Sequence, residues 1–476
     1  MRAISGSQQQ TMNRGVRAIH VDVRVYNTNK AAYVSLRNLY GFNFIRAVTY
    51  QEEIDDNGKT ATITVDRSIG TFSIAPTVQT GRVYADYGQL INLNVPIKIF
   101  VALLPFGQTP QGINDPGWLE VFWGRIYAMD WAKNSFTLSC RDWLDQLQSL
   151  WVENSAGIIP ANPGGVSAAT VMQQILNYAA ALPLANLQLP TLYSVNGTSA
   201  TPFLSTAPDN PGWAIKSTDP YPTSVQSIWT ALDNINQQIG WCLRQKWNAN
   251  IGTWALTWYD PARGNTASQF SFLPSALLDI SKCELHLGDI RNAVQIFYTY
   301  AGSTTNVPST YPPAVSGSPN YAYDAVSAAK YGRQFMQLGS DATPLINGAT
   351  VGSLTDFETL AKNAISDLAQ PAVDYMVDVM AFPFVELNDV YYFAADTEHF
   401  SQDQLFACIG YTTTIDGQTA KTTLSVRGKP SGGVQRWLAR QQQNFTKRIG
   451  AVSTNNSSDQ NGNQTANSSF SQFTRF

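Results

Sequence analysis

Apolar and polar positions alternate along the first part of the chain with the period of two that β-strands produce. Every second residue of Val21–Val25 is a valine, and threonines alternate with Ile63 and Val65. Residues 55–58 read Asp-Asp-Asn-Gly, and an Asn-Gly pair tolerates the positive φ angles of a tight turn. These patterns predict antiparallel hairpins, and residues 20–153 are expected to form a first barrel-like β domain.

A further hairpin is expected to close this region and lead into a short helix. Residues 118–130 and 135–140 are strand-like and flank a Lys-Asn turn. Apolar residues within 143–151 then recur at helical spacing. Asp142 precedes them, and we expect its side chain to accept hydrogen bonds from the free amides of the first helical turn.

The middle of the chain, residues 154–277, predicts a mixed α/β domain. Ser167 and Ser224 each precede an apolar stripe of helical period and are the expected helix caps. The stretch 182–221 is rich in Pro, Ser, Thr and Asn, which is typical of a long surface loop. Residues 241–259 favour two paired strands around an Asn-Ala-Asn turn.

Residues 278–430 predict a second barrel-like β domain with one packed helix at 353–370. Thr355 and Glu358 match a capping box, and Pro371 ends the helix. The helix precedes a predicted antiparallel sheet whose final hairpin turns at an Asp-Gly pair. Its strand-like runs are residues 374–381, 389–393, 404–412 and 421–428.

The last segment, residues 431–476, changes in character. After a candidate polar helix, residues 453–469 are almost entirely Asn, Ser, Gln, Thr and Gly, too hydrophilic to offset the entropy of ordering. We predict a mobile tail whose end, with Phe470, Phe473 and Phe476, docks into a neighbouring subunit. The alternative is a flexible terminus without a docking role.

Together the patterns predict an α+β fold that is mostly β. It consists of tandem antiparallel barrel-like domains, a mixed α/β middle domain and a flexible C-terminal tail, with residues 1–19 as an N-terminal arm. A chain of 476 residues exceeds what one hydrophobic core can organise, since single cores stop growing at roughly 250–300 residues.

The amino-acid composition is typical of a protein that forms permanent contacts with other subunits. Charged residues make up 14% of the chain, against about 25% in typical soluble proteins, and aromatic residues make up 12%. Such a surface suits permanent subunit contacts, where aromatics are enriched and Lys and Glu are depleted. The net charge of −3 gives no field that would attract nucleic acid or an anionic membrane. Neither an apolar leader nor a run of about 18 apolar residues is found, so we expect cytoplasmic synthesis and no membrane insertion.

The cysteines do not form a motif. No C-x-x-C pair occurs, so the sequence supports neither a zinc site nor a disulfide framework. We expect four separate buried thiols, at Cys140, Cys242, Cys283 and Cys408.

The histidines have no nucleophile motif beside them, so we interpret them as structural residues rather than catalytic bases. A candidate cation site is weighed at His399, but acidic residues in a loop are usually just solvated. We therefore expect no catalytic residue, no metal and no cofactor. The residues concerned are His20, His286 and His399 and the acidic neighbours of His399, namely Asp396, Glu398 and Asp403.

A glycan hydrolase would need two carboxylates that flank the scissile bond. Glu120 and Glu153 lie near aromatic residues, but Glu120 belongs to an alternating strand and Glu153 lies near the end of a helix. We interpret both as structural. A cell-wall hydrolase stays the alternative function, and a receptor-binding module, suggested by the 182–221 loop and the surface aromatics, is a third.

Two stretches of the sequence carry further patterns. The first comprises Phe122-Trp123-Gly124-Arg125-Ile126, a turn, and Phe136–Asp142 with the helix after it. The second comprises Asp324–Gln334, the capped helix, Phe382–Val390 and the Asp416-Gly417 hairpin. In the second, Gly332 is expected to follow an extended strand, and Glu386 and Asp389 are expected to cap free amides in a turn. Both stretches resemble the tail hub proteins of bacteriophages.

The resemblance implies a non-enzymatic structural protein at the distal end of the tail in the virion. Such hubs are homotrimeric rings of two related barrels per chain. They adapt the hexameric tail tube or distal tail protein to a threefold central spike or fibre. The ring gives a channel for DNA without binding it sequence-specifically, and the tape-measure protein is a further candidate partner.

Overall fold

Strands form where alternation predicts them, because each strand buries every second side chain. In β4 (Thr60–Asp66), Ala61, Ile63 and Val65 are buried, and the threonines between them are less so.

The computed structural model describes residues 6–12, 17–27, 31–37, 43–54, 58–66, 91–112, 114–132, 135–153, 158–160, 162–182, 191–194, 214–217, 226–239, 242–248, 252–259, 268–284, 290–298, 309–311, 321–338, 361, 365, 368–369, 374–396, 398 and 400–428.

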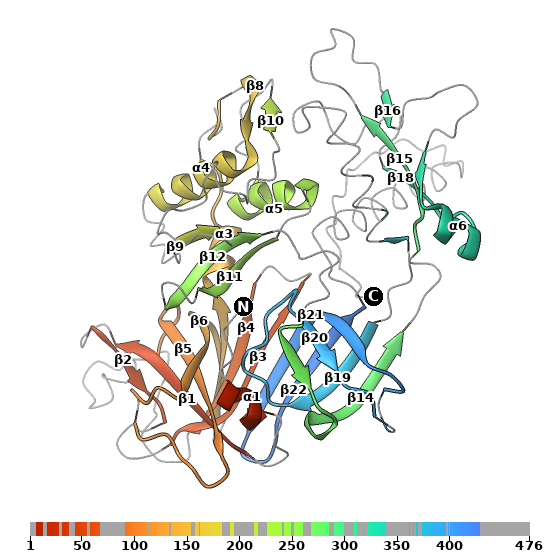
Figure 1. Cartoon of the computed structure of the whole chain (residues 1–476). Coiled ribbons are helices and arrows are strands. Elements are labelled where there is room, and N and C mark those ends of the chain that lie inside the picture. Colours follow the sequence, from red (N-terminus) through yellow and green to blue (C-terminus); the bar gives the residue numbers. More distant parts are fainter. Residues whose placement is uncertain are drawn as a thin grey trace, which may run out of the picture.

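The first part of the chain supplies one half of a large sheet (Figure 1). The two predicted hairpins are confirmed: β3 pairs antiparallel with β4, and β6 pairs antiparallel with β7. A short helix, α1 (Gly6–Met12), precedes the strands. The other strands of this half are β1 (Arg17–Asn27), β2 (Ala32–Ser35), β3 (Ile45–Glu53), β5 (Pro96–Pro105), β6 (Trp118–Trp131) and β7 (Ser135–Asp142).

The second half of the sheet comes mainly from the last described part of the chain. The hairpin at Asp416 is confirmed, since β21 pairs antiparallel with β22 and the Asp416 carboxylate accepts a 2.7 Å hydrogen bond from the Gln418 amide. The strands of this half are β13 (Phe270–Phe272), β14 (Leu277–Glu284), β19 (Asp374–Met380), β20 (Val390–Phe393), β21 (Gln404–Asp416) and β22 (Ala420–Arg427).

One long strand, β21, joins the two halves. Its first residues pair with β20, and its residues from Gly410 to Asp416 pair with β3. The result is a 13-stranded sheet whose main path runs β14-β19-β22-β21-β3-β4-β7-β6-β5-β1-β2. The sequence predicted two separate barrels, and their separateness is wrong, because the described strands of both halves belong to one sheet. The strand order of this sheet begins at β14 and ends at β2, and these two strands do not pair with each other. The mostly β fold class is confirmed.

The middle region covers one end of this sheet with helices α4 (Ala168–Ala181) and α5 (Ile228–Ile239). Helix α4 begins directly after Ser167, as predicted. Ser224, the predicted cap of the second helix, lies outside the described residues; helix α5 begins at Ile228, and the Ser227 hydroxyl before it accepts a 3.1 Å hydrogen bond from the Thr230 amide. The region also contains the 3₁₀ turn η1 (Trp143–Asp145), α3 (Gln146–Ser149), β8 (Asn162–Ser167), β9 (Thr191–Ser194), β10 (Ala214–Ser217), β11 (Cys242–Asn248) and β12 (Thr253–Tyr259).

A small four-stranded sheet lies at the upper right of Figure 1. Helix α6 (Ala325–Tyr331) precedes its last strand, where the sequence predicted an extended strand before Gly332. Asp324 caps this helix by accepting a 2.8 Å hydrogen bond from the Ser327 amide, and Gly332 ends it at a φ of 74°. The strands are β15 (Ala293–Tyr298), β16 (Ser309–Tyr311), β17 (Ala322–Tyr323) and β18 (Phe335–Leu338), and the 3₁₀ turn η2 (Pro274–Ala276) precedes β14.

Two hydrophobic cores hold the chain together. The first lies in the large sheet and draws on both halves, with Val23 and Phe136 from one and Leu424 from the other. The second unites the middle helices with β15, through Ile175, Leu232, Val294 and others. Of the predicted helix at 353–370, Ala361, Ile365 and Leu368 are helical, while its capping box lies outside the described residues. The domain boundaries stay predictions.

Candidate functional site

Strand β11 carries three consecutive polar side chains, and each one binds a different part of the chain. The Arg244 guanidinium donates a 2.6 Å hydrogen bond to the carbonyl oxygen of Ile54, at the β3–β4 turn. The Gln245 amide donates to the carbonyl oxygen of Trp123 in β6 at 2.8 Å. The Lys246 ammonium donates to the carbonyl oxygen of Leu387, which precedes β20, at 3.3 Å. We call these three side chains and their partners the β11 junction.

Alternation along β11 explains how neighbouring residues reach different partners. Arg244 and Lys246 lie on one side of the strand and Gln245 on the other. Gln245 also accepts a 3.2 Å hydrogen bond from the Trp143 amide through its side-chain oxygen. Since Arg244 and Gln245 are buried, their polar groups must be paired inside the protein, and the contacts above pair them.

A buried charge cluster surrounds Arg244. The Lys59 ammonium lies 3.8 Å from the Glu52 carboxylate and 4.9 Å from the Trp254 ring centroid. Glu52 also accepts a 3.2 Å hydrogen bond from the Tyr411 hydroxyl, which comes from the other half of the sheet. Burial alone would lower the pKa of Arg244, but Glu52 holds that pKa above its ordinary value. Arg244 therefore keeps its positive charge inside the protein.

A second cluster surrounds Lys246. Its ammonium lies 3.8 Å from the Glu386 carboxylate and 4.2 Å from the Tyr259 ring centroid. Burial raises the pKa of Asp389 to about 7, with repulsion from Glu386 adding to the effect and Lys246 opposing it. The sequence predicted that Glu386 and Asp389 cap turn amides, and the structure places both carboxylates beside polar side chains. Glu386 faces Lys246, and Asp389 accepts a hydrogen bond from the Tyr391 hydroxyl.

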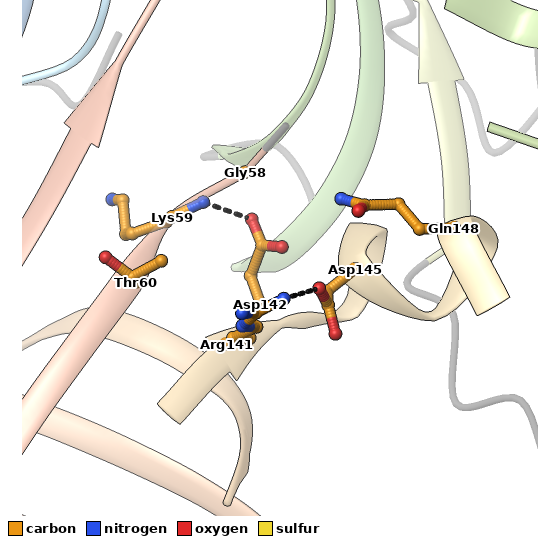
Figure 2. A pocket seen from close by; sticks show the side chains of 7 residues that line it. All are labelled: Gly58, Lys59, Thr60, Arg141, Asp142, Asp145 and Gln148. Atoms are coloured by element: carbon orange, nitrogen blue, oxygen red, sulfur yellow. Dashed lines mark hydrogen bonds and ion pairs between the residues drawn. The ribbon is translucent and has the colours of Figure 1, made fainter. Parts of the chain in front are cut away.

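An open pocket of about 200 Å³ lies beside the first cluster. Figure 2 shows Asp142 at its centre, with Gln148 on one side and Lys59 on the other. The Asp142 carboxylate accepts a 2.8 Å hydrogen bond from the Lys59 amide, while its second oxygen has no hydrogen-bond partner in the described part of the chain. Burial raises the pKa of Asp142 to about 7, although the Lys59 hydrogen bond opposes the rise.

The role predicted for Asp142 as a helix cap is therefore wrong. Its side chain makes no hydrogen bond to the turn that follows and instead binds across to the start of β4. The backbones of the two residues also meet, because the Asp142 amide donates to the Lys59 carbonyl oxygen at 3.0 Å. Asp142 thus extends the β4–β7 pairing. Gly58 covers its free oxygen so closely that a Cβ at Gly58 would overlap the carboxylate.

Asp145, at the other wall of the pocket, is fully paired. Its two oxygens accept from the Arg125 guanidinium at 2.9 Å and from the Arg141 guanidinium at 2.6 Å. The pocket is therefore lined by two carboxylates: Asp145, which is ion-paired, and Asp142, whose free oxygen is covered by Gly58. Neither is placed to flank a substrate bond as an acid–base pair.

The two candidate hydrolase carboxylates are not brought together as a site. Glu120 accepts hydrogen bonds on both oxygens, from Lys98 at 3.0 Å and from the Trp254 indole at 2.9 Å. Glu153 is exposed, and its amide donates to the Tyr178 hydroxyl at 2.9 Å. A carboxylate whose two oxygens are both engaged by donors of its own chain is a poor candidate for a general acid, because neither oxygen is free to face a substrate.

The histidine candidates fall in different places. His20 contacts the carbonyl oxygen of Gln108 through Nε2, at 2.9 Å, and the Arg37 guanidinium through Nδ1. His286 and His399 lie outside the described residues. The acidic neighbours of His399 bind backbone: Asp396 accepts from the Phe400 amide and Asp403 from the Ala395 amide. No group of three or more metal-ligating side chains is found in the part of the chain that the structure describes.

Of the cysteines, three are buried as predicted and one is not. Cys140, Cys242 and Cys408 are buried, and burial raises the pKa of the Cys140 and Cys408 thiols. Cys283 is exposed, because it lies on the edge strand β14.

No described helix has both the length and the apolar character needed to cross a membrane. Phe470, Phe473 and Phe476 lie outside the described residues.

Sequence reasoning missed the charged residues of the β11 junction and of the cluster beside Arg244. Lys59, Arg244 and Lys246 were not singled out, because a single charged residue in a strand-like run gives no spacing motif. One signal was present: β11 places Arg-Gln-Lys between apolar residues in a chain with only 14% charged residues. Charged residues inside an apolar run are rarely fully buried unless they are paired.

Comparison with known proteins adds the following. No family model and no curated protein sequence matches the chain. Among solved structures, the tail protein of Neisseria meningitidis MC58 is 12% identical with a TM-score of 0.49, and the match covers 86% of this chain and 96% of that one. The solved structures that this chain resembles include tail proteins and a component of the type VI secretion system.

Two further tail proteins resemble the chain to a similar degree. The 43 kDa tail protein of prophage MuSo2 from Shewanella oneidensis is 10% identical with a TM-score of 0.49, and the match covers 86% of this chain and 98% of that one. The prophage tail protein gp18 from Listeria monocytogenes is 11% identical with a TM-score of 0.45, covering 85% and 94%. At this identity the likeness is one of fold alone.

Proposed function

We propose that this chain is a structural hub of a phage tail tip. Three copies form a ring that adapts the hexameric tail tube or distal tail protein to the threefold central spike or fibre. The ring is part of the channel through which DNA passes, and the tape-measure protein is a candidate partner inside it. The role is structural rather than catalytic.

One observation carries the proposal: both stretches that resemble tail hubs are bound to strand β11. Trp123, in the first stretch, accepts the hydrogen bond of Gln245, and Leu387, in the second, accepts that of Lys246. The residues that carry the resemblance are thus the ones that fix the two halves of the sheet against the middle region. An adaptor needs such a brace, because its two partner faces must keep a fixed relative orientation.

The charge distribution supports the same role. Lys59 and Lys246 form buried ion pairs, and Arg244 binds a backbone carbonyl oxygen, so these three cations act inside the chain and not on a substrate. A surface of this kind, rich in aromatics and low in charge, suits large permanent interfaces with other subunits. A peptidoglycan hydrolase, the alternative, would require a carboxylate free to exchange a proton, and both oxygens of Glu120 are held by donors.

The proposal is tested by reconstitution with the proteins encoded beside it. The purified chain is mixed with tail-tube or distal tail subunits and with the candidate spike, and the products are imaged by electron microscopy after negative staining. The proposal expects a threefold ring bound between the two partners. Particles of single chains that bind neither partner would contradict it.

A further inference from the structure

An aromatic patch is exposed on the four-stranded sheet. It consists of Tyr321, Tyr323 and Phe335, and the Tyr321 ring contacts the other two: its centroid lies 5.8 Å from that of Tyr323 and 5.5 Å from that of Phe335. Tyr323 is 50% exposed and Phe335 is 47% exposed. Both half-exposed residues contact the Tyr321 ring, so the three side chains form one continuous apolar surface. Continuous apolar surfaces, unlike single exposed apolar residues, mark interaction sites.

The strand register sets the spacing of this patch. Ala293 in β15 pairs with Tyr323 of β17 on one side and with Phe335 of β18 on the other. Neighbouring strands lie about 4.8 Å apart, so the backbones of Tyr323 and Phe335 are roughly 10 Å apart. Tyr321 contacts both outer rings. A partner that presents two rings at a repeat near 10 Å would match the two outer rings.

A cation borders the patch. The Arg333 guanidinium lies 5.9 Å from the centroid of the Tyr321 ring. Tyrosine and arginine dominate the energetic centres of protein interfaces, because they combine a large apolar area with hydrogen-bond donors. The patch therefore has the composition of a docking site for an apolar, extended segment whose backbone carbonyls Arg333 can bind.

The chain itself contains a segment with this repeat. Forty-eight residues of the sequence follow Gly428, and their end reads Phe-Ser-Gln-Phe-Thr-Arg-Phe, with phenylalanine at every third position from Phe470. Residues 453–469, just before it, contain one apolar residue, Ala466. In a polyproline II conformation, with three residues per turn and about 3.1 Å rise per residue, every third side chain lies on the same side, about 9 Å from the next.

We propose that residues Phe470–Phe476 of this chain bind the aromatic patch. Successive phenylalanine rings pack against Tyr323 and Phe335 on either side of Tyr321, and Arg333 binds the carbonyl oxygens of the segment. The polar residues 453–469 act as a tether of about 20 Å or more of reach. This inference does not rest on the hub function proposed above, since it needs only two parts of the same chain.

Photo-crosslinking in the full chain tests the inference. Benzoylphenylalanine is placed at Phe473, and in a control chain at Gln460, which lies in the polar tether. After irradiation the crosslinked peptides are identified by mass spectrometry. We expect the Phe473 probe to capture the peptide that contains Tyr321–Phe335, and the Gln460 probe to capture it far less. A crosslink within one chain and a crosslink between two chains, which a denaturing gel separates, both support docking.

Variants of the patch complete the test. Tyr323→Ser with Phe335→Ser removes two exposed rings and is expected to lower the crosslink yield about tenfold, because each aromatic pair contributes on the order of the free energy that a tenfold change requires. Leu278→Ser removes an exposed apolar side chain of β14 and is expected to leave the yield unchanged. Circular dichroism confirms that both variants fold. Absence of a crosslink from Phe473, crosslinks to other surfaces, or an unchanged yield in the patch variant overturns the inference.

Discussion

Arg244 donates a 2.6 Å hydrogen bond to the carbonyl oxygen of Ile54, a residue 190 positions earlier in the chain. The Arg244 side chain is 1% exposed, so this contact lies deep between the β3–β4 hairpin and the middle region. A guanidinium in such a place stabilises only when its donors are paired, and loss of the arginine leaves the carbonyl oxygen without its donor. The contact is therefore a sensitive point of the β11 junction.

Replacement of Arg244 by Met is expected to lower the free energy of unfolding by about 2–4 kcal/mol, because a buried acceptor loses its donor and Glu52 loses a compensating charge. Urea titration followed by tryptophan fluorescence measures the change. Lys330→Met, which removes an exposed cation of α6, is the matched control and is expected to cost less than about 0.5 kcal/mol. Equal stability of the two variants would show that the junction does not brace the chain.

Stability is expected to depend on pH through Asp142. Burial raises its pKa from 3.8 to about 7. Between these values the folded protein holds a proton that the unfolded chain has released, so stability falls as the pH rises toward 7 and levels off above it. Asp142→Asn abolishes this titration while its side-chain oxygen can still accept from the Lys59 amide. The groups that face Asp142 are Lys59, Glu52 and Arg244, and all three are unchanged in the variant.

The measurement compares urea unfolding at pH 5.5 and pH 8.5. The loss of stability between these pH values is expected to be smaller in Asp142→Asn than in the unaltered chain by about 2 kcal/mol. Asp389, whose pKa burial also raises to about 7, gives the variant a remaining pH dependence. Glu398→Gln, at an exposed loop position, is the control. A variant with the same pH dependence as the unaltered chain would contradict the assignment.

Gly124 is expected to tolerate no side chain. A Cβ at this position would overlap the carbonyl oxygen of Arg141, on the strand paired with β6. Gly124→Ala must therefore push β6 and β7 apart, and we expect a loss of about 2 kcal/mol or more. Gly417→Ala, in a turn where a Cβ meets nothing within 4 Å, is the control. Thermal unfolding distinguishes the two, and equal melting temperatures would remove this explanation of the glycine in the first hub-like stretch.

Glu120 is expected to act in folding and not in catalysis. Its hydrogen bonds to Lys98 and Trp254 link β6 to β5 and to the middle region. Glu120→Gln should therefore cost about 1–2 kcal/mol of stability, since each lost hydrogen bond to a charged group contributes on that order. Zymography on peptidoglycan is expected to show no clearing with either form. Clearing by the unaltered chain that Glu120→Gln abolishes would establish the hydrolase instead.

Local patterns predicted the strands and their turns. The alternation in β4 and the Asp-Gly turn at Asp416 each follow from a few neighbouring residues, and the structure has both elements. The mostly β class follows from the sum of such patterns. Helix α6 was missed because its seven residues are too few to establish a helical period, and the Asp324 cap is the signal that would have revealed it.

The joining of the two halves could not be predicted. The pairing of β21 with β3 brings together residues more than 350 positions apart, and no local pattern encodes which exposed strand edge meets which. Asp142 shows the same limit. Its position before a helical run predicted a cap, but the tertiary contact with the Lys59 amide took its side chain instead. The junction residues are likewise defined by partners that are distant in sequence.

The mass of the purified chain in solution tests the central claim most directly. Light scattering coupled to size-exclusion chromatography reports it without reference to a standard shape. A trimeric hub predicts about 157 kDa, three times the 52.2 kDa of one chain, and a mass that stays constant on dilution. A stable mass of 52.2 kDa at high protein concentration, also in the presence of tube and spike proteins, would contradict the account.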